Sequence, residues 1–257
     1  MSLNRYYVAI GIAFAICASM DTARNVLASQ KEDFASLEAE ATRALRPESE
    51  VFAERAALVA RLQAASERAP DANQRARFAL LWLQAVRSIL AKMPFGPSAE
   101  EPYREWLERH EKVVIYSEPA GQWLLVPEII WKVHDAHRSS ASSEAIAWFA
   151  IENGFPGECE GYIPCYANIL NWLDGEYLRR HPRGPHASEA VNRVHESLTQ
   201  SVNFLSEPDT KRYLDPSTDC GDLKRGLVPL RQAIDRSNAE RRVATIALID
   251  TLLARCR

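Results

Sequence analysis

The sequence has little glycine, few alternating segments and no apolar run long enough to cross a bilayer. Only 10 of the 257 residues are glycine, and few stretches alternate apolar with polar residues as a half-buried strand would. Alanine, leucine, glutamate and arginine are plentiful instead, and these residues lose little side-chain freedom in a helix. The deficits exclude a β-rich fold and favour an all-α fold.

The sequence also lacks a basic cluster and the glycine-rich motifs that bind phosphates. The formal net charge is −3 and the arginines alternate with acidic residues, which excludes the basic footprint of a nucleic-acid-binding domain. There is no Gly-x-Gly-x-x-Gly, no P-loop and no Gly-x-Ser-x-Gly motif. We therefore expect no cofactor and no nucleic-acid partner. The sequence leaves open whether the protein is an enzyme, and we favour a protein without catalytic activity.

The N-terminus has the pattern of a signal peptide. Arg5 precedes an apolar segment over residues 8–18, which has the length of a secretory core and is too short for a bilayer span. We predict a signal peptide over residues 1–28, cut between 17 and 28, and a single helical domain over 29–257. The alternative is a buried helix or an uncleaved anchor. Export would place the protein in the periplasm or outside the cell, with only transient membrane contact through the leader.

Removal of the leader would leave an even number of cysteines. Cys17 lies in the leader, and the four that follow allow three disulfide pairings. We favour Cys159–Cys165, because glycine and proline between them permit a tight turn, and Cys220–Cys256, which would tie the last helix to the rest of the chain. Free thiols and a zinc site are the alternatives, although the spacing does not match the usual zinc ligands.

Apolar residues at helical spacing predict an antiparallel helical array or an irregular α-solenoid. Asp71 is a suitable N-cap for one of these helices. The segment 113–126 contains two short apolar runs around a turn, and it forms either a small β-hairpin or two helix ends. The predicted helices cover residues 30–45, 49–69, 72–92, 127–133, 144–153, 166–181, 187–205, 223–235 and 238–255, with a shorter one around 103–107.

Residues 176–191 resemble the junction between two helices of tetratricopeptide-type repeats. A helix there ends in Glu-Tyr-Leu-Arg-Arg, a proline-containing turn follows, and the next helix opens with alanines. The resemblance implies a helical-repeat arrangement. It covers 16 residues, and the chain has no second copy about 34 residues away.

The histidines suggest two sites. His134 and His137 are three residues apart, so both imidazoles could lie on one helix face and share a metal ion. The alternative is that they lie near a helix C-terminus, where partial positive charge is favourable. Farther along, His181 and His186 flank a Pro-Arg-Gly-Pro turn, and an anion could bind there, where Arg179, Arg180 and Arg183 cluster with the start of the next helix. The alternative is that the two histidines are loop and cap residues.

Aromatic residues concentrate between residues 100 and 180. Tyrosine and tryptophan often anchor interfaces, because they combine a large apolar area with a polar tip; filling the core is the alternative. We expect an exported helical protein that binds a protein or peptide partner in the cell envelope, for example as an inhibitor or immunity protein. The alternatives are a metal-dependent hydrolase using His134 and His137, and a purely structural envelope protein. The candidate binding residues are Trp106, Trp123, Trp131, Trp148 and Tyr162.

Overall fold

The computed structural model describes residues 34–44, 52–96, 100–207, 210 and 213–256. The chain divides into two compact units, residues 1–85 and 86–257. The predicted signal peptide over 1–28, with Cys17, lies outside the described residues. The expectation of one helical domain over 29–257 stays a prediction.

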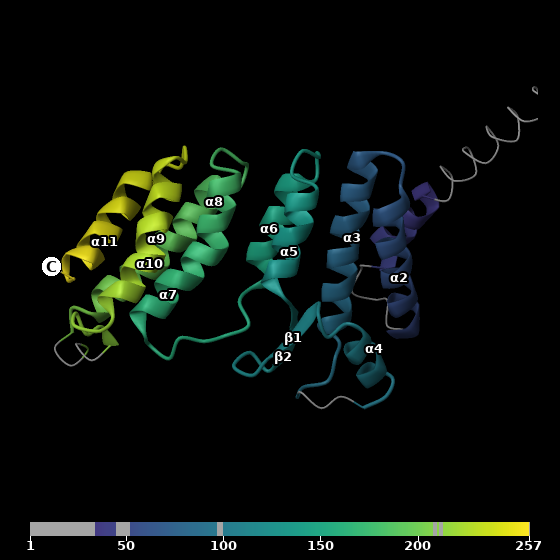
Figure 1. The fold of residues 1–257 in the computed structure, drawn as a ribbon, viewed down its shortest axis with the longest axis horizontal. Coiled ribbons are helices and arrows are strands. Elements are labelled where there is room, and N and C mark those ends of the chain that lie inside the picture. Colours follow the sequence, from purple (N-terminus) through teal and green to yellow (C-terminus); the bar gives the residue numbers. More distant parts are fainter. Residues whose placement is uncertain (1–33, 45–51, 97–99, 208–209, 211–212, 257) are drawn as a thin grey trace, which may run out of the picture. The chain divides into compact units, whose positions relative to one another are not determined.

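The described part of the first unit is helical. Residues 34–44 are helical, and α2 (Phe52–Arg68) and α3 (Ala72–Leu90) follow (Figure 1). The predicted N-cap of α3 is confirmed, because an Asp71 carboxylate oxygen accepts a hydrogen bond from the Gln74 amide at 2.9 Å. Leucines and alanines at helical spacing form the apolar faces. The buried side chains of this unit include Ala41, Leu58, Val59, Leu62, Phe78, Leu81 and Leu83.

The second unit begins with the last turn of α3 and continues with a short helix and a hairpin. After α4 (Tyr103–Arg109), strands β1 (Val114–Ser117) and β2 (Gln122–Leu125) pair antiparallel. Gly121 takes a positive φ of 62° in the turn between the strands, a conformation that glycine adopts without steric cost. The hairpin is therefore confirmed, and the alternative of two helix ends is wrong.

Two helices that carry much of the candidate site follow the hairpin. α5 (Pro127–Ala136) begins with a proline, which needs no backbone donor at that position. α6 (Ser143–Asn153) ends at Gly154, whose φ of 80° stops the helix. The two helices pack against each other. Among the described helices, none combines the length and the apolar character needed to cross a membrane.

The remaining helices surround the main core of the second unit. α10 packs against α7 and α11, and α11 packs against α9. The core draws its side chains from all of these helices, with Leu173, Tyr177, Leu198, Leu227, Leu230 and Ile249 among its members. The helices are α7 (Ile163–Leu170), the π-helical turn η1 (Asn171–Gly175), α8 (Glu176–Arg180), α9 (Ala187–Phe204), α10 (Cys220–Asp235) and α11 (Arg242–Ala254). The all-α prediction is confirmed.

Both predicted cysteine pairs lie at disulfide distance. The Cα atoms of Cys159 and Cys165 are 5.5 Å apart, and those of Cys220 and Cys256 are 5.6 Å apart. The first pair closes the loop before α7. The second joins the first residue of α10 to the chain just after α11. The predicted pairing is confirmed, and the alternatives of free thiols and a zinc site do not fit these cysteines.

Candidate functional site

An aromatic groove lies beside α5 and η1. Its volume is about 380 Å³, within the range of small-ligand pockets. Trp131 of α5, Phe155 and Trp172 of η1 supply its aromatic surface. We call this cavity the aromatic groove, and its other lining residues are Pro127, Glu128, Lys132, Asp135, Asn171, Leu173, Glu176 and Arg179.

Trp172 is the exposed ring of the groove. Its residue surface is 52% exposed, and its ring meets Phe155 edge-on at a centroid distance of 5.8 Å. Trp131 is half-buried, and the Arg180 guanidinium lies 4.8 Å from its ring centroid, a cation–π arrangement that fixes the indole plane. The groove therefore presents one held tryptophan and one exposed tryptophan.

The five candidate binding residues do not form one surface. Trp106 and Trp148 are only 2% and 8% exposed, so they belong to the core and cannot offer a surface to a partner. Trp123 and Tyr162 are half-buried and do not line the groove. Only Trp131 lines it. The core-filling alternative is therefore correct for Trp106 and Trp148.

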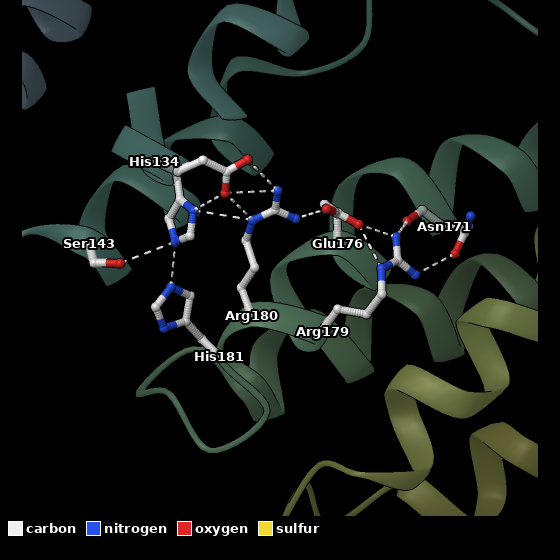
Figure 2. A network of polar contacts seen from close by, with 8 residues as sticks. His134, Ser143, Asn171, Glu176, Arg179, Arg180 and His181 are labelled. Atoms are coloured by element: carbon white, nitrogen blue, oxygen red, sulfur yellow. Dashed lines mark hydrogen bonds and ion pairs between the residues drawn. The ribbon is translucent and has the colours of Figure 1, made fainter. Parts of the chain in front are cut away.

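A polar network borders the groove, and His134 is at its centre (Figure 2). His134 Nε2 lies 2.9 Å from His181 Nε2 and 3.1 Å from Ser143 Oγ. On the other side of the ring, Nδ1 lies 3.1 Å from both Asp135 Oδ1 and Arg180 Nε. Arg180 Nε can donate to an unprotonated Nδ1, whereas Asp135 Oδ1 can only accept from a protonated one, so the two contacts belong to different tautomers. A neutral ring carries one proton, either on Nδ1 toward Asp135 or on Nε2 toward His181 or Ser143.

Two arginines extend the network along α8. Arg180 Nη2 contacts both carboxylate oxygens of Asp135 at 3.1 Å, and Arg180 also pairs with Glu176. Arg179 donates through Nε to Glu176 at 2.6 Å and through Nη1 to Asn171 Oδ1 at 2.8 Å. Figure 2 shows the resulting chain of contacts from Ser143 to Asn171. The charges on this wall of the groove are thus already paired.

Burial keeps both histidines of the network neutral over a wider pH range than usual. Burial lowers the pKa of His134, and the positive charge of Arg180 adds to this effect against the opposing influence of Asp135. Burial also lowers the pKa of His181, with His134 as the next cause. Two imidazole nitrogens 2.9 Å apart can share only one proton, so the contact itself requires one ring to accept.

Ser143, His134 and Asp135 touch in the order of a nucleophile, a base and an orienting carboxylate. Ser143 and His134 are only 4% and 3% exposed, however, and neither lines the aromatic groove. The arrangement therefore orients the imidazole, and it offers no reachable nucleophile.

The metal hypothesis loses its geometric basis. The second histidine near His134 is His181, whereas His137 is the C-cap of α5, with its amide bonded to the His134 carbonyl at 3.0 Å. Among the described residues, no group of three or more His, Cys, Asp or Glu side chains could hold a metal ion. A metal at His134 would also have to displace its present protein contacts.

The π-helical turn η1 shapes the site in a way that the sequence did not suggest. Asn171 faces Arg179, and Asp174, which is 1% exposed, pairs with Arg193 of α9 at 3.0 Å. Burial raises the pKa of Asp174 to about 6, although Arg193 opposes the effect. π-Helical turns often occur at functional sites. Here the turn exposes Trp172 while it buries its neighbours, whereas helical spacing places Trp172 on the apolar stripe of a regular helix.

The chain matches no known family model, no curated protein and no solved structure. The resemblance of residues 176–191 to tetratricopeptide-type repeats therefore stays a prediction. Locally, the expected helix, turn and helix are present as α8, the turn and α9.

Proposed function

We propose that this protein is a binding protein of an extracytoplasmic compartment, and that it captures an apolar side chain of a protein or peptide partner in the aromatic groove. The exposure of Trp172 opposite a held Trp131 carries the proposal. Large aromatic rings dominate the energetics of interfaces when a partner covers them. A partner that covers an exposed indole in a cavity therefore gains a large share of its binding free energy there.

On the α8 side of the groove, paired charges favour an apolar anchor over a charged one, whereas Glu128 and Lys132 add one charge of each sign to the lining. Glu176 is bound by both Arg179 and Arg180, and Asp135 is bound by Arg180. A charged ligand would compete with these contacts, whereas an apolar side chain gains from the rings without disturbing them. The fixed polar groups at the rim can then hydrogen-bond to a peptide backbone.

The disulfides support the compartment. Two bonded cysteine pairs suit an oxidising extracellular environment. Together with the predicted signal peptide, they favour a periplasmic or secreted protein acting in the cell envelope, where an inhibitor or immunity protein would use such a groove. A metal-dependent hydrolase using His134 and His137 has no comparable support.

A peptide selection tests the groove. Short random peptides displayed on phage are selected on the disulfide-bonded protein, and the affinities of the winners are measured by fluorescence anisotropy. We expect peptides with a shared aromatic or long aliphatic residue whose Kd rises at least about tenfold in Trp172→Ala. Phe95→Ala is the control, because Phe95 is 88% exposed and does not line the groove.

Two outcomes would count against the proposal. Equal affinities for the parent protein and Trp172→Ala would move binding away from the groove. Failure to select any peptide would favour the purely structural envelope protein.

The compartment has a separate test. The protein is expressed with its N-terminus intact, and the mature chain is analysed by mass spectrometry. We expect a cut between residues 17 and 28, which removes Arg5 and the apolar segment. Full-length protein recovered from the cytosol with free thiols would contradict export, and this result would leave the proposal for the aromatic groove unaffected.

A further inference from the structure

A second cavity lies between the α8–α9 turn and the α10–α11 turn. Its volume is about 1180 Å³. Arg183 comes from the first turn, Arg236 comes from the second, and Arg242 is the first residue of α11. We call this space the arginine cavity. His181 and Glu144 also line it, so His181 joins the polar network around His134 to this second cavity.

The three arginines of the cavity differ from most other arginines of this unit because they form no ion pair with a described carboxylate. Arginines such as Arg180, Arg193 and Arg231 form ion pairs with carboxylates. Among the described residues, none of Arg183, Arg236 and Arg242 does so, since the ion pairs of the second unit involve other arginines. Within the described part of the chain, no carboxylate therefore holds any of these three guanidinium groups in an ion pair.

The two carboxylates of the cavity offset only part of this charge. Glu144 keeps its negative charge while it accepts a hydrogen bond from the Tyr177 hydroxyl at 2.6 Å. Asp235 is exposed, and its backbone carbonyl, not its carboxylate, accepts the hydrogen bond from Arg242. The positive charge of Arg236 also helps to lower the pKa of Arg179, after the larger effect of burial. The positive charges in the lining outnumber the negative ones.

The cavity walls are held in place. Arg242 Nη1 donates to the Asp235 carbonyl at 2.9 Å, and Arg236 Nε donates to the Gln232 carbonyl at 3.2 Å. Each guanidinium has five N–H donors, so these bonds position the group and leave donors for a ligand. The Asn238 amide also donates to the Pro182 carbonyl at 3.4 Å, which links the two turns.

We propose that the arginine cavity binds a phosphate group, either of a soluble phosphate ester or of a phospholipid headgroup. A carboxylate satisfies one guanidinium in a bidentate contact, whereas a dianionic phosphate offers enough oxygens for three. Of the arginines near the Pro-Arg-Gly-Pro turn that suggested an anion site, Arg179 and Arg180 are occupied by carboxylates, and Arg183 faces the cavity with Arg236 and Arg242. The site is separate from the aromatic groove.

The test uses the full disulfide-bonded protein and two phosphate sources. In one arm, inorganic phosphate is titrated at constant ionic strength while backbone amide resonances are followed by NMR. In the other, the protein is sedimented with phosphatidylcholine vesicles containing one-fifth phosphatidic acid, and with vesicles of phosphatidylcholine alone. We expect saturable shifts at residues 183–184 and 236–242, or sedimentation that needs phosphatidic acid. Shifts alone identify a soluble ester, and sedimentation alone identifies a lipid headgroup.

Arg183→Glu is the decisive variant, because Arg183 is exposed and the substitution leaves the hydrogen bonds of the other two arginines in place. We expect binding to weaken at least about tenfold, and Arg236→Glu should act in the same direction. Arg225→Ala is the control, since Arg225 pairs with Asp222 outside the cavity. No binding in either arm, or binding that survives Arg183→Glu, would overturn the proposal. Neither result depends on the groove or on Trp172.

Discussion

At the scale of single residues, one buried hydroxyl joins three parts of the second unit. Tyr177 is fully buried, its hydroxyl donates to Glu144 of α6 at 2.6 Å, and it accepts from the His186 amide before α9 at 3.2 Å. Burial raises the pKa of Tyr177, and Glu144 raises it further, so the group stays a donor at physiological pH. Its loss would leave a carboxylate and an amide without this partner.

We predict that Tyr177→Phe lowers the free energy of unfolding by about 1–3 kcal/mol, because the fully buried hydroxyl bonds two half-buried partners that would lose this contact. Urea denaturation followed by circular dichroism measures the change. The control is Tyr166→Phe, since Tyr166 is 38% exposed and water can replace its hydroxyl contacts. Equal effects of the two substitutions would show that the Glu144 contact contributes nothing.

The paired histidines predict a pH-dependent stability. Burial lowers the pKa of His181 in the folded state, so the unfolded chain binds a proton first as the pH falls below about 6.5. As the pH is lowered through this window, the free energy of unfolding therefore decreases, and the decrease ends below the pKa of His181 in the folded state. Asp174 has the opposite effect: because its pKa is raised to about 6, its protonation stabilises the folded state as the pH falls from about 6 toward the ordinary pKa of an aspartate.

A comparison with His181→Gln isolates the histidine, because both proteins contain Asp174. Glutamine can still donate to or accept from His134 but does not titrate. We expect the stability difference between parent and variant to shift in favour of the variant from pH 7.5 to pH 5, by a few degrees in Tm at roughly 2–4 °C per kcal/mol. A stability difference that is independent of pH, or that moves toward the parent on acidification, would contradict a lowered pKa of His181.

Some residue contacts could be predicted from the sequence and others could not. The cysteine pairs could be predicted, because turn residues and chain ends limit which cysteines can meet. His134 could be picked out, but its partner His181 could not, since they are 47 residues apart and meet only through packing of α5 against the end of α8. Trp172 was not distinguishable from a core residue, because its exposure depends on η1.

At the scale of elements, α7 and α10 approach more closely than side chains would allow. A Cβ at Gly226 of α10 would lie 2.7 Å from the Ala167 carbonyl carbon and 2.8 Å from the Asn168 nitrogen of α7. Both atoms are backbone, so neither can turn away. Gly226 therefore sets the distance between these two helices.

We predict that Gly226→Ala destabilises the protein by about 1–3 kcal/mol through overpacking, although alanine favours a helix by about 1 kcal/mol over glycine. Gly221→Ala in the same helix is the matched control, because a Cβ there meets nothing within 4 Å. It should leave stability unchanged or raise it. Thermal unfolding of both variants measures the contrast, and destabilisation by both would point to the helix itself instead of its contact with α7.

Element type could be predicted more readily than element detail. Apolar spacing and breaker residues predict α6 and the stop at Gly154, whereas two short runs around Gly121 leave a hairpin and two helix ends as alternatives. The turn η1 could not be predicted, because one wider turn within residues 166–181 leaves the apolar spacing nearly unchanged. The pair of Asp174 with Arg193 that accompanies it joins residues of different helices.

At the scale of the whole molecule, the two disulfides should differ in their contribution to stability. In the chain-entropy model, a crosslink stabilises by restricting the unfolded chain, and the effect grows with the loop that it closes. Cys159 and Cys165 are separated by 6 positions, whereas Cys220 and Cys256 are separated by 36. The longer loop also contains α11, whose Ile249 and Leu252 are fully buried.

We predict that replacing Cys220 and Cys256 with alanine costs about 4 kcal/mol, whereas replacing Cys159 and Cys165 costs about 2 kcal/mol. Guanidinium denaturation of both double variants measures the costs. Dithiothreitol reduces both disulfides of the parent, so the reduced parent should be less stable than either oxidised variant. In each variant, dithiothreitol can reduce only the one remaining disulfide. Hydrogen exchange should show the first double variant opening at α11, because the bond closes the chain just beyond that helix. A larger contribution from Cys159–Cys165 than from Cys220–Cys256 would contradict the chain-entropy model. Native contacts of residues 159–165 would then determine how much that disulfide adds to the free energy of unfolding.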